Sequence, residues 1–171
     1  IRAMVAAGSE YFWMQPIFTV GARTGGVHLN YERVPVGPGD PVFMEVAGVY
    51  GRYTAPIMRT SMLGEPSNDM LALADNCNVA FDLLMHEIRP GRTGHEVNAA
   101  MLKALKDVPE IGAYDHKYFA YSVGLGWGDG DMYIAEGIER PLLPGMTFHT
   151  ARANRYPGRI GVGLSETILV T

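Results

Sequence analysis

The acidic residue with the most informative surroundings is Glu45, which lies in the middle of the apolar run Phe43–Ala47. Strand side chains alternate between two faces, so Glu45 would share its face with Phe43 and Ala47. A carboxylate in such a strand either faces solvent on a one-sided sheet or lines a cavity, because an unpaired charge is costly to bury. The sequence favours the two interpretations equally. In a cavity, Glu45 could attack an electrophilic carbon or activate water.

The histidines are the other side chains that could move protons, and they are His28, His86, His95, His116 and His149. No two of them have the H-x-x-x-H spacing of a zinc-binding helix. His86 and His95 lie near expected helix ends, where a role at the surface or with the helix dipole is favoured. His28 and His149 lie in strand and loop segments, where functional sites are more often built.

The glycine-rich run Gly124–Gly130 lacks the G-x-G-x-x-G spacing, and no clear helix follows it. It therefore does not indicate nucleotide binding. Asp129 and Asp131 resemble the start of a calcium loop, but Arg140 stands where the bidentate glutamate would be. A solvated loop is the favoured interpretation of this segment.

The composition suits one domain of 171 residues, with 47% hydrophobic and only 19% charged residues. A deficit of charge suggests surface that another domain or subunit covers. The net charge of -4 argues against nucleic acid and an anionic membrane as partners. No apolar run is long enough for a bilayer span. Cys77 is the single cysteine, so it forms no internal disulfide and fits a reducing cytoplasm.

Strand-like segments stand at both ends of the chain, with two helices between them. We expect strands at residues 17–20, 42–50 and 52–62, with Pro56 marking a sheet edge or a bulge. After the helices, a loop at 126–137 separates expected strands at 119–125, 146–153 and 160–171. This order predicts an α+β fold in which helices cover one side of a curved, mostly antiparallel sheet.

The two expected helices have clear end signals. The first begins after Ser67, a good N-cap, and stops at Pro90-Gly91. The second begins in the capping-box pattern Thr93–Glu96 and ends at Pro109.

Residues 39–60 resemble the pita-bread family, which includes methionine aminopeptidases, Xaa-Pro dipeptidases, aminopeptidase P and creatinase. The shared pattern is Gly-Asp, an apolar strand that carries an acid, a tight turn, and Arg-Thr. Leu143–Phe148 and Gly161–Thr171 resemble two later strand motifs of the family. The motifs occur in the family's order and cover nearly the whole chain. The resemblance implies a pita-bread fold with helices on the outer face of the sheet.

Metallopeptidases of this family bind two metal ions through two Asp, one His and two Glu. The resemblance places these five positions, in chain order, on Glu45, Pro56, Tyr121, Ala151 and Ser165. Four of the five cannot serve as ordinary ligands for a hard divalent ion. We therefore expect no metal ion and no other cofactor.

Among members of the family, the metal-independent ectoine hydrolase branch is the most similar. The similarity lies in the runs Phe43–Gly48, Arg52–Thr60, Tyr121–Gly126, Met146–His149 and Leu164–Thr167. It implies a hydrolase that acts on a C–N bond of a small nitrogen compound, such as a cyclic amidine. One departure is Trp127–Gly130, which replaces the usual Pro-Pro-x-W segment and would shape the pocket.

The resemblance also implies roles for individual residues. The catalytic candidates are Glu45, His28 and His149, and the substrate-binding candidates are Tyr121, Glu166 and Tyr53. Glu45 would attack the carbon or activate water, while His28, with His149 as second candidate, would shuttle protons. Two alternatives remain open. One is a metal-dependent Xaa-Pro dipeptidase or aminopeptidase P-type peptidase, and the other is a non-catalytic binding module.

We expect residues 1–171 to form the C-terminal, peptidase-like catalytic domain of a longer protein, truncated at its N-terminal side. The chain opens at Ile1 without a methionine and ends on a strand-like run. The resemblance implies a preceding N-terminal domain, absent here, and a homodimer. We expect a cytoplasmic protein with a small-molecule substrate and no nucleic-acid or membrane partner.

Overall fold

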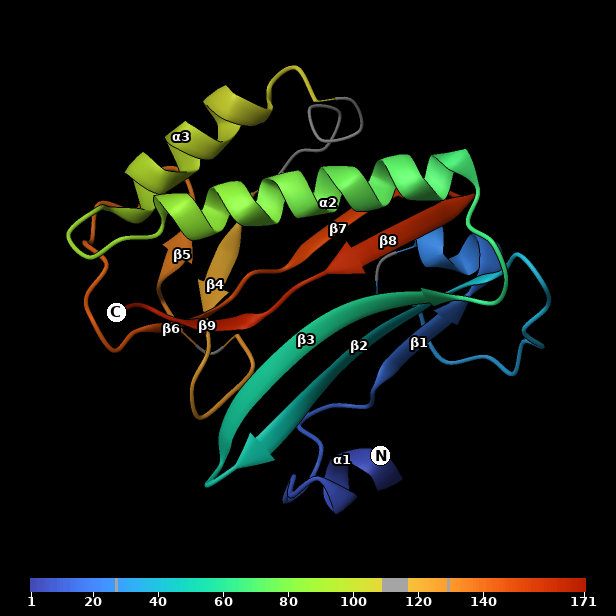
Figure 1. The fold of residues 1–171 in the computed structure, drawn as a ribbon. Coiled ribbons are helices and arrows are strands. Elements are labelled where there is room, and N and C mark those ends of the chain that lie inside the picture. The colour runs from blue at the N-terminus through green and yellow to red at the C-terminus, as the bar shows by residue number, and fades with distance from the viewer. Residues whose placement is uncertain (27, 109–116, 129) are drawn as a thin grey trace.

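The computed structural model describes residues 1–26, 28–108, 117–128 and 130–171 (Figure 1). A short helix α1 (Arg2–Ala6), the strand β1 (Ile17–Val20) and a 3₁₀ turn η1 (Gly21–Gly25) come first. The strands β2 (Pro41–Tyr50) and β3 (Tyr53–Met62) then form a long hairpin. The expected α+β class is confirmed.

The hairpin register is set by its two-residue turn. Gly51 and Arg52 both have positive φ angles, 54° and 68°, as a type I′ turn requires. The register continues through Pro56, which pairs with Ala47 without a bulge. Because β1 pairs with the other side of β2, β3 is the edge strand of this sheet. Proline is tolerated there because an edge strand leaves some N–H groups unpaired.

The described residues form three antiparallel sheets rather than one continuous sheet. Besides β1-β2-β3, the strands β5 (Tyr133–Ile134), β4 (Ala120–Ser122), β6 (Thr147–His149) and β9 (Thr167–Leu169) form the second. β7 (Arg152–Tyr156) and β8 (Ile160–Leu164) form the third. An isolated bridge between Met58 and Ser165 joins the hairpin to the C-terminal strands.

The expected C-terminal strands are shorter than their apolar runs suggest. The run 146–153 divides into β6 and β7, and the run 160–171 divides into β8 and β9. Thr150 and Glu166 occupy the two breaks and bond to each other: the Thr150 N–H donates to the Glu166 carbonyl, and the Glu166 N–H to Thr150 Oγ1, both at 3.0 Å. The expected strand 119–125 is reduced to β4, and β5 lies inside the expected loop.

Both helices begin at the predicted caps. α2 (Asn68–Glu87) has the Met70 N–H donating to Ser67 Oγ at 3.3 Å. α3 (Gly94–Leu105) has the full capping box of Thr93 and Glu96. The expected stop at Pro109 lies outside the described residues. In the described part of the chain, none of the helices combines the length and apolarity needed to cross a bilayer.

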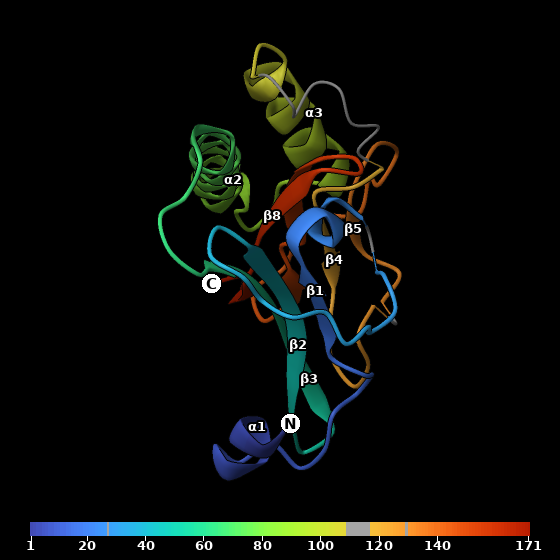
Figure 2. The ribbon, with the colours of Figure 1, turned by 90° about the vertical axis from the view of Figure 1, so that its right-hand side faces the viewer.

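Helices α2 and α3 lie on one side of the C-terminal strands, while the β2–β3 hairpin extends away from them (Figures 1 and 2). The main core lies between the helices and β4–β6, with Leu84, Met101, Phe119 and Phe148 among its buried members. β8 packs closely on β2 at Gly163, where a Cβ atom would lie 2.3 Å from the Phe43 ring. This close contact fixes the buried face of β2 against the C-terminal half.

Candidate functional site

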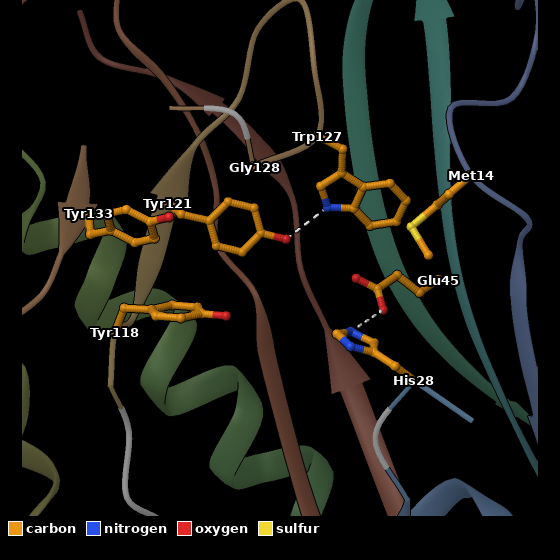
Figure 3. Close-up of a pocket in the computed structure, with 8 residues that line it drawn as sticks. All are labelled: Met14, His28, Glu45, Tyr118, Tyr121, Trp127, Gly128 and Tyr133. Carbon is orange, nitrogen blue, oxygen red and sulfur yellow. Dashed lines mark hydrogen bonds and ion pairs between the residues drawn. The ribbon is translucent and has the colours of Figure 1, made fainter. Parts of the chain in front are cut away.

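Glu45 lies on the buried face of β2, which alternates between buried and more exposed positions along its length. Its side chain is only 1% exposed, and it lines a cavity of about 310 Å³. The other lining residues come from four further segments: Met14, His28, Tyr118, Tyr121, Trp127, Gly128 and Tyr133 (Figure 3). Of the two interpretations of Glu45, the structure therefore supports the cavity.

The carboxylate of Glu45 is buried without the hydrogen bonds that usually offset the cost of burying a charge. Neither Oε1 nor Oε2 has a hydrogen-bond partner among the described residues. His28 Nε2 lies 3.5 Å from Oε2, which is an ion-pair distance rather than a well-formed hydrogen bond. Burying a carboxylate in this way is costly unless a bound group pairs with it. The arrangement fits a site that accepts a hydrogen-bond donor or a cation.

His28 approaches Glu45 from the segment that follows η1. Its backbone has a φ of 51°, an uncommon conformation for a residue with a side chain. The ring remains largely open to solvent, with 64% of the side chain exposed. The neighbouring Glu45 carboxylate raises the pKa of His28 above its ordinary value of 6.5, against partial burial and the charge of Arg155. A solvent-connected imidazole with a raised pKa can carry a proton to and from the carboxylate.

Aromatic rings form the wall opposite Glu45 (Figure 3). Tyr118 and Tyr121 meet edge to face with their centroids 5.5 Å apart, and Tyr133 lies 5.6 Å from Tyr118. Burial raises the pKa of Tyr121 well above its ordinary value, and the Glu45 charge adds to this effect. The hydroxyl ends of Tyr118 and Tyr121 point toward the Glu45 side of the cavity (Figure 3), so this wall offers both aromatic surface and phenol groups to a bound molecule.

His149 lies behind this wall and does not line the cavity. Its ring is fully buried, with Nδ1 2.8 Å from the Tyr121 hydroxyl and Nε2 2.6 Å from Ser165 Oγ. Burial lowers the pKa of His149 to about 3, so the ring is neutral at physiological pH. The structure thus brings Glu45, His28 and Tyr121 together at one cavity and connects His149 to it through Tyr121.

The remaining two substrate-binding candidates lie apart from this cavity. Tyr53 is 63% exposed and lines a separate apolar groove between α1 and the hairpin, together with Met4 and Val49. Glu166 forms an ion pair with Arg59, whose guanidinium also donates to the backbone carbonyls of Met58 and Ser165. Arg59 therefore anchors β3 to the C-terminal strands, and Glu166 takes part in that anchor.

The positions that hold metal ions in the resembling metallopeptidases do not supply a matching donor set here. Pro56 and Ala151 have no side-chain donor atom, and Ala151 packs against an apolar cluster around Phe43. Tyr121 and Ser165 are both hydrogen-bonded to His149. Among the described residues, no three His, Cys, Asp or Glu side chains lie together so as to hold a metal ion. His116 and Asp129, weighed above as ligands, lie outside the described residues.

Three cavity residues were not anticipated from the sequence: Met14, Tyr118 and Tyr133. Tyr133 is the direct cross-strand partner of Tyr121 in the β4–β5 pair, and Tyr118 precedes β4. A β4–β5 hairpin prediction would have placed these rings together. The two-residue strand β5 was too short for its pattern to stand out from the surrounding loop.

Comparison with known proteins finds a match between residues 1–171 and the model of metallopeptidase family M24. The ectoine hydrolase of Halomonas elongata is 27% identical over 176 residues, which covers 96% of this chain and 41% of that protein. A probable dipeptidase PepE of Mycobacterium tuberculosis is 31% identical over 175 residues, which covers 99% of this chain and 45% of that protein.

Solved structures agree with the family match. The crystal structure of dipeptidase PepE from Mycobacterium ulcerans matches 99% of this chain and 45% of that chain, with a TM-score of 0.89 and 28% identity. The chain therefore spans less than half the length of each of these relatives.

Proposed function

The chain belongs to metallopeptidase family M24 and has its pita-bread fold, and on that premise we propose a hydrolase that acts without a metal ion. Its substrate is a small, positively charged nitrogen compound, of the cyclic amidine type, in which a C–N bond is broken. The observation that carries this proposal is the Glu45 carboxylate, which faces a cavity and has no hydrogen-bond partner for either oxygen among the described residues, only the 3.5 Å ion-pair contact with His28.

The charge and shape of the cavity support a cationic substrate. An amidinium is flat, positively charged and rich in N–H donors, so it could pair with Glu45 and pack on the rings of Tyr118 and Tyr121. Because the pair lies in a buried pocket of low dielectric, the attraction is stronger there than in water. The ectoine hydrolase relative supports the same class of substrate by its name.

Glu45 and His28 could together perform the hydrolysis. Glu45 takes a proton from a water molecule, and the water oxygen forms a bond to the amidine carbon. The C–N bond then breaks with its electron pair on nitrogen, which takes a proton from the His28 imidazolium. The added hydroxyl becomes the carbonyl, and its remaining proton goes to the released amine, which leaves as an ammonium group. The proton on Glu45 passes to His28 across the 3.5 Å between them, which restores both groups. Direct attack by Glu45 on the carbon is the covalent variant of the same route.

Replacing Glu45 with Gln in the protein at its natural length tests this proposal, with ectoine as the first substrate. We expect Glu45→Gln to abolish turnover and leave the circular dichroism spectrum unchanged. Glu139→Gln, at a 72% exposed carboxylate, is the matched control and should keep full activity. Turnover retained by Glu45→Gln would rule out the assigned role.

A metal-dependent peptidase is the second candidate, supported by the 31% identity to the dipeptidase relative. Such an enzyme would hydrolyse Xaa-Pro dipeptides and lose activity to a chelator, whereas the proposed hydrolase would not. A non-catalytic binding module would need no acid–base pair, and the 3.5 Å approach of His28 to Glu45 speaks against it. Assays of ectoine and Xaa-Pro dipeptides, each with and without chelator, separate the three candidates.

A further inference from the structure

A line of four side chains runs from the interior to the cavity wall. The Met58 N–H donates to Ser165 Oγ at 2.7 Å, and Ser165 Oγ lies 2.6 Å from His149 Nε2. On the other side of the ring, His149 Nδ1 lies 2.8 Å from the Tyr121 hydroxyl. Trp127 Nε1–H also donates to that hydroxyl at 2.8 Å. The end of the line, Tyr121, lines the cavity that Glu45 faces (Figure 3).

The donors at the two ends limit where the protons can be. The Met58 N–H and the Trp127 indole N–H can only donate, so Ser165 Oγ and the Tyr121 oxygen each accept one hydrogen bond. His149 is neutral, because burial lowers its pKa to about 3, and its ring therefore has one N–H and one acceptor nitrogen. Two arrangements of protons are then possible.

In the first arrangement, Nε2 carries the proton and donates to Ser165. The Ser165 hydroxyl would then accept twice, and its own hydrogen would need another acceptor. Ser165 is fully buried, and Met58 and His149 are its side-chain hydrogen-bond partners in the described part of the chain. This arrangement leaves a buried donor unsatisfied, which is costly.

In the second arrangement, the Ser165 hydroxyl donates to Nε2, and Nδ1–H donates to the Tyr121 oxygen. Every buried polar atom of the line is then satisfied. The Tyr121 oxygen accepts from both His149 and Trp127, so its own hydrogen is free of the protein network. Burial raises the pKa of Tyr121, which keeps that hydrogen in place.

We infer that Tyr121 is a fixed hydrogen-bond donor of the cavity, and that Ser165 sets its direction from behind through the His149 tautomer. His149 and Ser165 are positioning residues, since Tyr121 separates them from the cavity. The cavity would then take a ligand with a positive group toward Glu45 and an acceptor atom toward Tyr121. In the proposed hydrolysis, on which this identification of the ligand rests, the acceptor is the oxygen that water adds to the amidine carbon.

The tautomer can be measured without any assumption about activity. In ¹⁵N-labelled protein, we expect His149 to show a protonated Nδ1 and an unprotonated Nε2, with no titration between pH 5 and pH 8. The His149→Gln spectrum assigns its signals by their absence. An Nε2–H tautomer, or titration near pH 6.5, would overturn the inference. If the Nδ1–H tautomer is present but ectoine and amidines are not hydrolysed, the proposed function fails while the tautomer assignment stands.

Kinetics then test the role of the donor. Tyr121→Phe should lower kcat about a hundredfold, as loss of one donor to a developing oxyanion does, with KM nearly unchanged. Ser165→Ala should lower kcat about tenfold, because the tautomer is no longer fixed, and Ser165→Thr should restore it. Both losses should leave the pH profile set by His28 unchanged. Full kcat in Tyr121→Phe, or no rescue by Ser165→Thr in a folded protein, would contradict the role.

Discussion

Glu45 and His149 are both buried polar side chains near one cavity, with exposures of 1% and 0%, yet their surroundings differ. Both oxygens of Glu45 lack hydrogen-bond partners among the described residues. Both ring nitrogens of His149 have one, through Tyr121 and Ser165. A satisfied network can be explained by folding alone, because buried polar atoms need partners. A buried carboxylate without hydrogen-bond partners cannot be explained by folding alone, so its partner is to be sought in a ligand.

We call Glu45 with its cavity the Glu45 side, and His149 with its partners Tyr121 and Ser165 the His149 side. The two sides are expected to contribute differently to stability and to function. The Glu45 side holds a buried carboxylate whose burial costs folding energy and which, in the proposed function, performs the chemistry. The His149 side holds groups that satisfy each other's hydrogen bonds and that, by the inference above, orient the phenol of Tyr121. Substitutions that separate stability from activity can test this division.

The largest effect is expected for Glu45→Met, which removes a buried charge that lacks hydrogen-bond partners among the described residues but keeps the side-chain volume. Activity should fall by more than about a thousandfold. The free energy of unfolding should rise by about 1–3 kcal/mol, because the buried carboxylate no longer has to be desolvated. Urea denaturation and initial rates measure the two quantities. A less stable variant would show that the interactions of Glu45 in the folded protein, including the ion pair with His28, outweigh the cost of burying its charge.

In the His149 network, by contrast, the substitution His149→Leu is expected to lower stability. The variant leaves the Tyr121 and Ser165 hydroxyls without their shared partner, which should lower the free energy of unfolding by about 2–4 kcal/mol. His28→Leu is the matched control: its side chain is 64% exposed, so its stability should change by less than about 0.5 kcal/mol. Equal losses in the two variants would remove the distinction between the two sides.

The sequence predicted the features that depend on neighbouring residues, but not those that depend on contacts between distant parts of the chain. The caps at Ser67 and Thr93–Glu96 depend on neighbouring residues, and both helices begin where the sequence places them. The burial of Glu45 depends on β8, which packs on β2 from more than a hundred residues away, so the sequence left it undecided. The break before β9 has the same cause, since Ser165 bonds to Met58 across the fold.

The His149 network makes a prediction about acid. Its pKa is lowered to about 3 in the folded protein and is close to 6.5 in the unfolded chain, so the unfolded chain binds a proton as pH falls through 6.5. Its stabilising contribution is therefore complete above pH 6.5 and decreases toward pH 3. Between pH 7.5 and pH 5, the stability advantage of the natural protein over His149→Leu should shrink by about 2 kcal/mol. A constant difference in urea titrations would mean that folding does not lower the pKa of His149.

His28 should show the opposite sign and the smallest effect. Its pKa is raised above 6.5 by Glu45, so the ion pair stabilises the folded protein below pH 6.5 and is lost as pH rises through the raised pKa. Because the imidazole is largely exposed, this contribution should be no more than about 0.5 kcal/mol. An NMR titration measures the pKa directly, and Glu45→Gln should bring it down to about 6.5 or below, since partial burial and Arg155 then act unopposed. Glu32→Gln, at a carboxylate paired with Arg23, is the control and should leave the pKa of His28 unchanged. If Glu45→Gln also leaves the pKa of His28 unchanged, then the carboxylate and the imidazole do not interact electrostatically. The proposed proton path between them would then be ruled out.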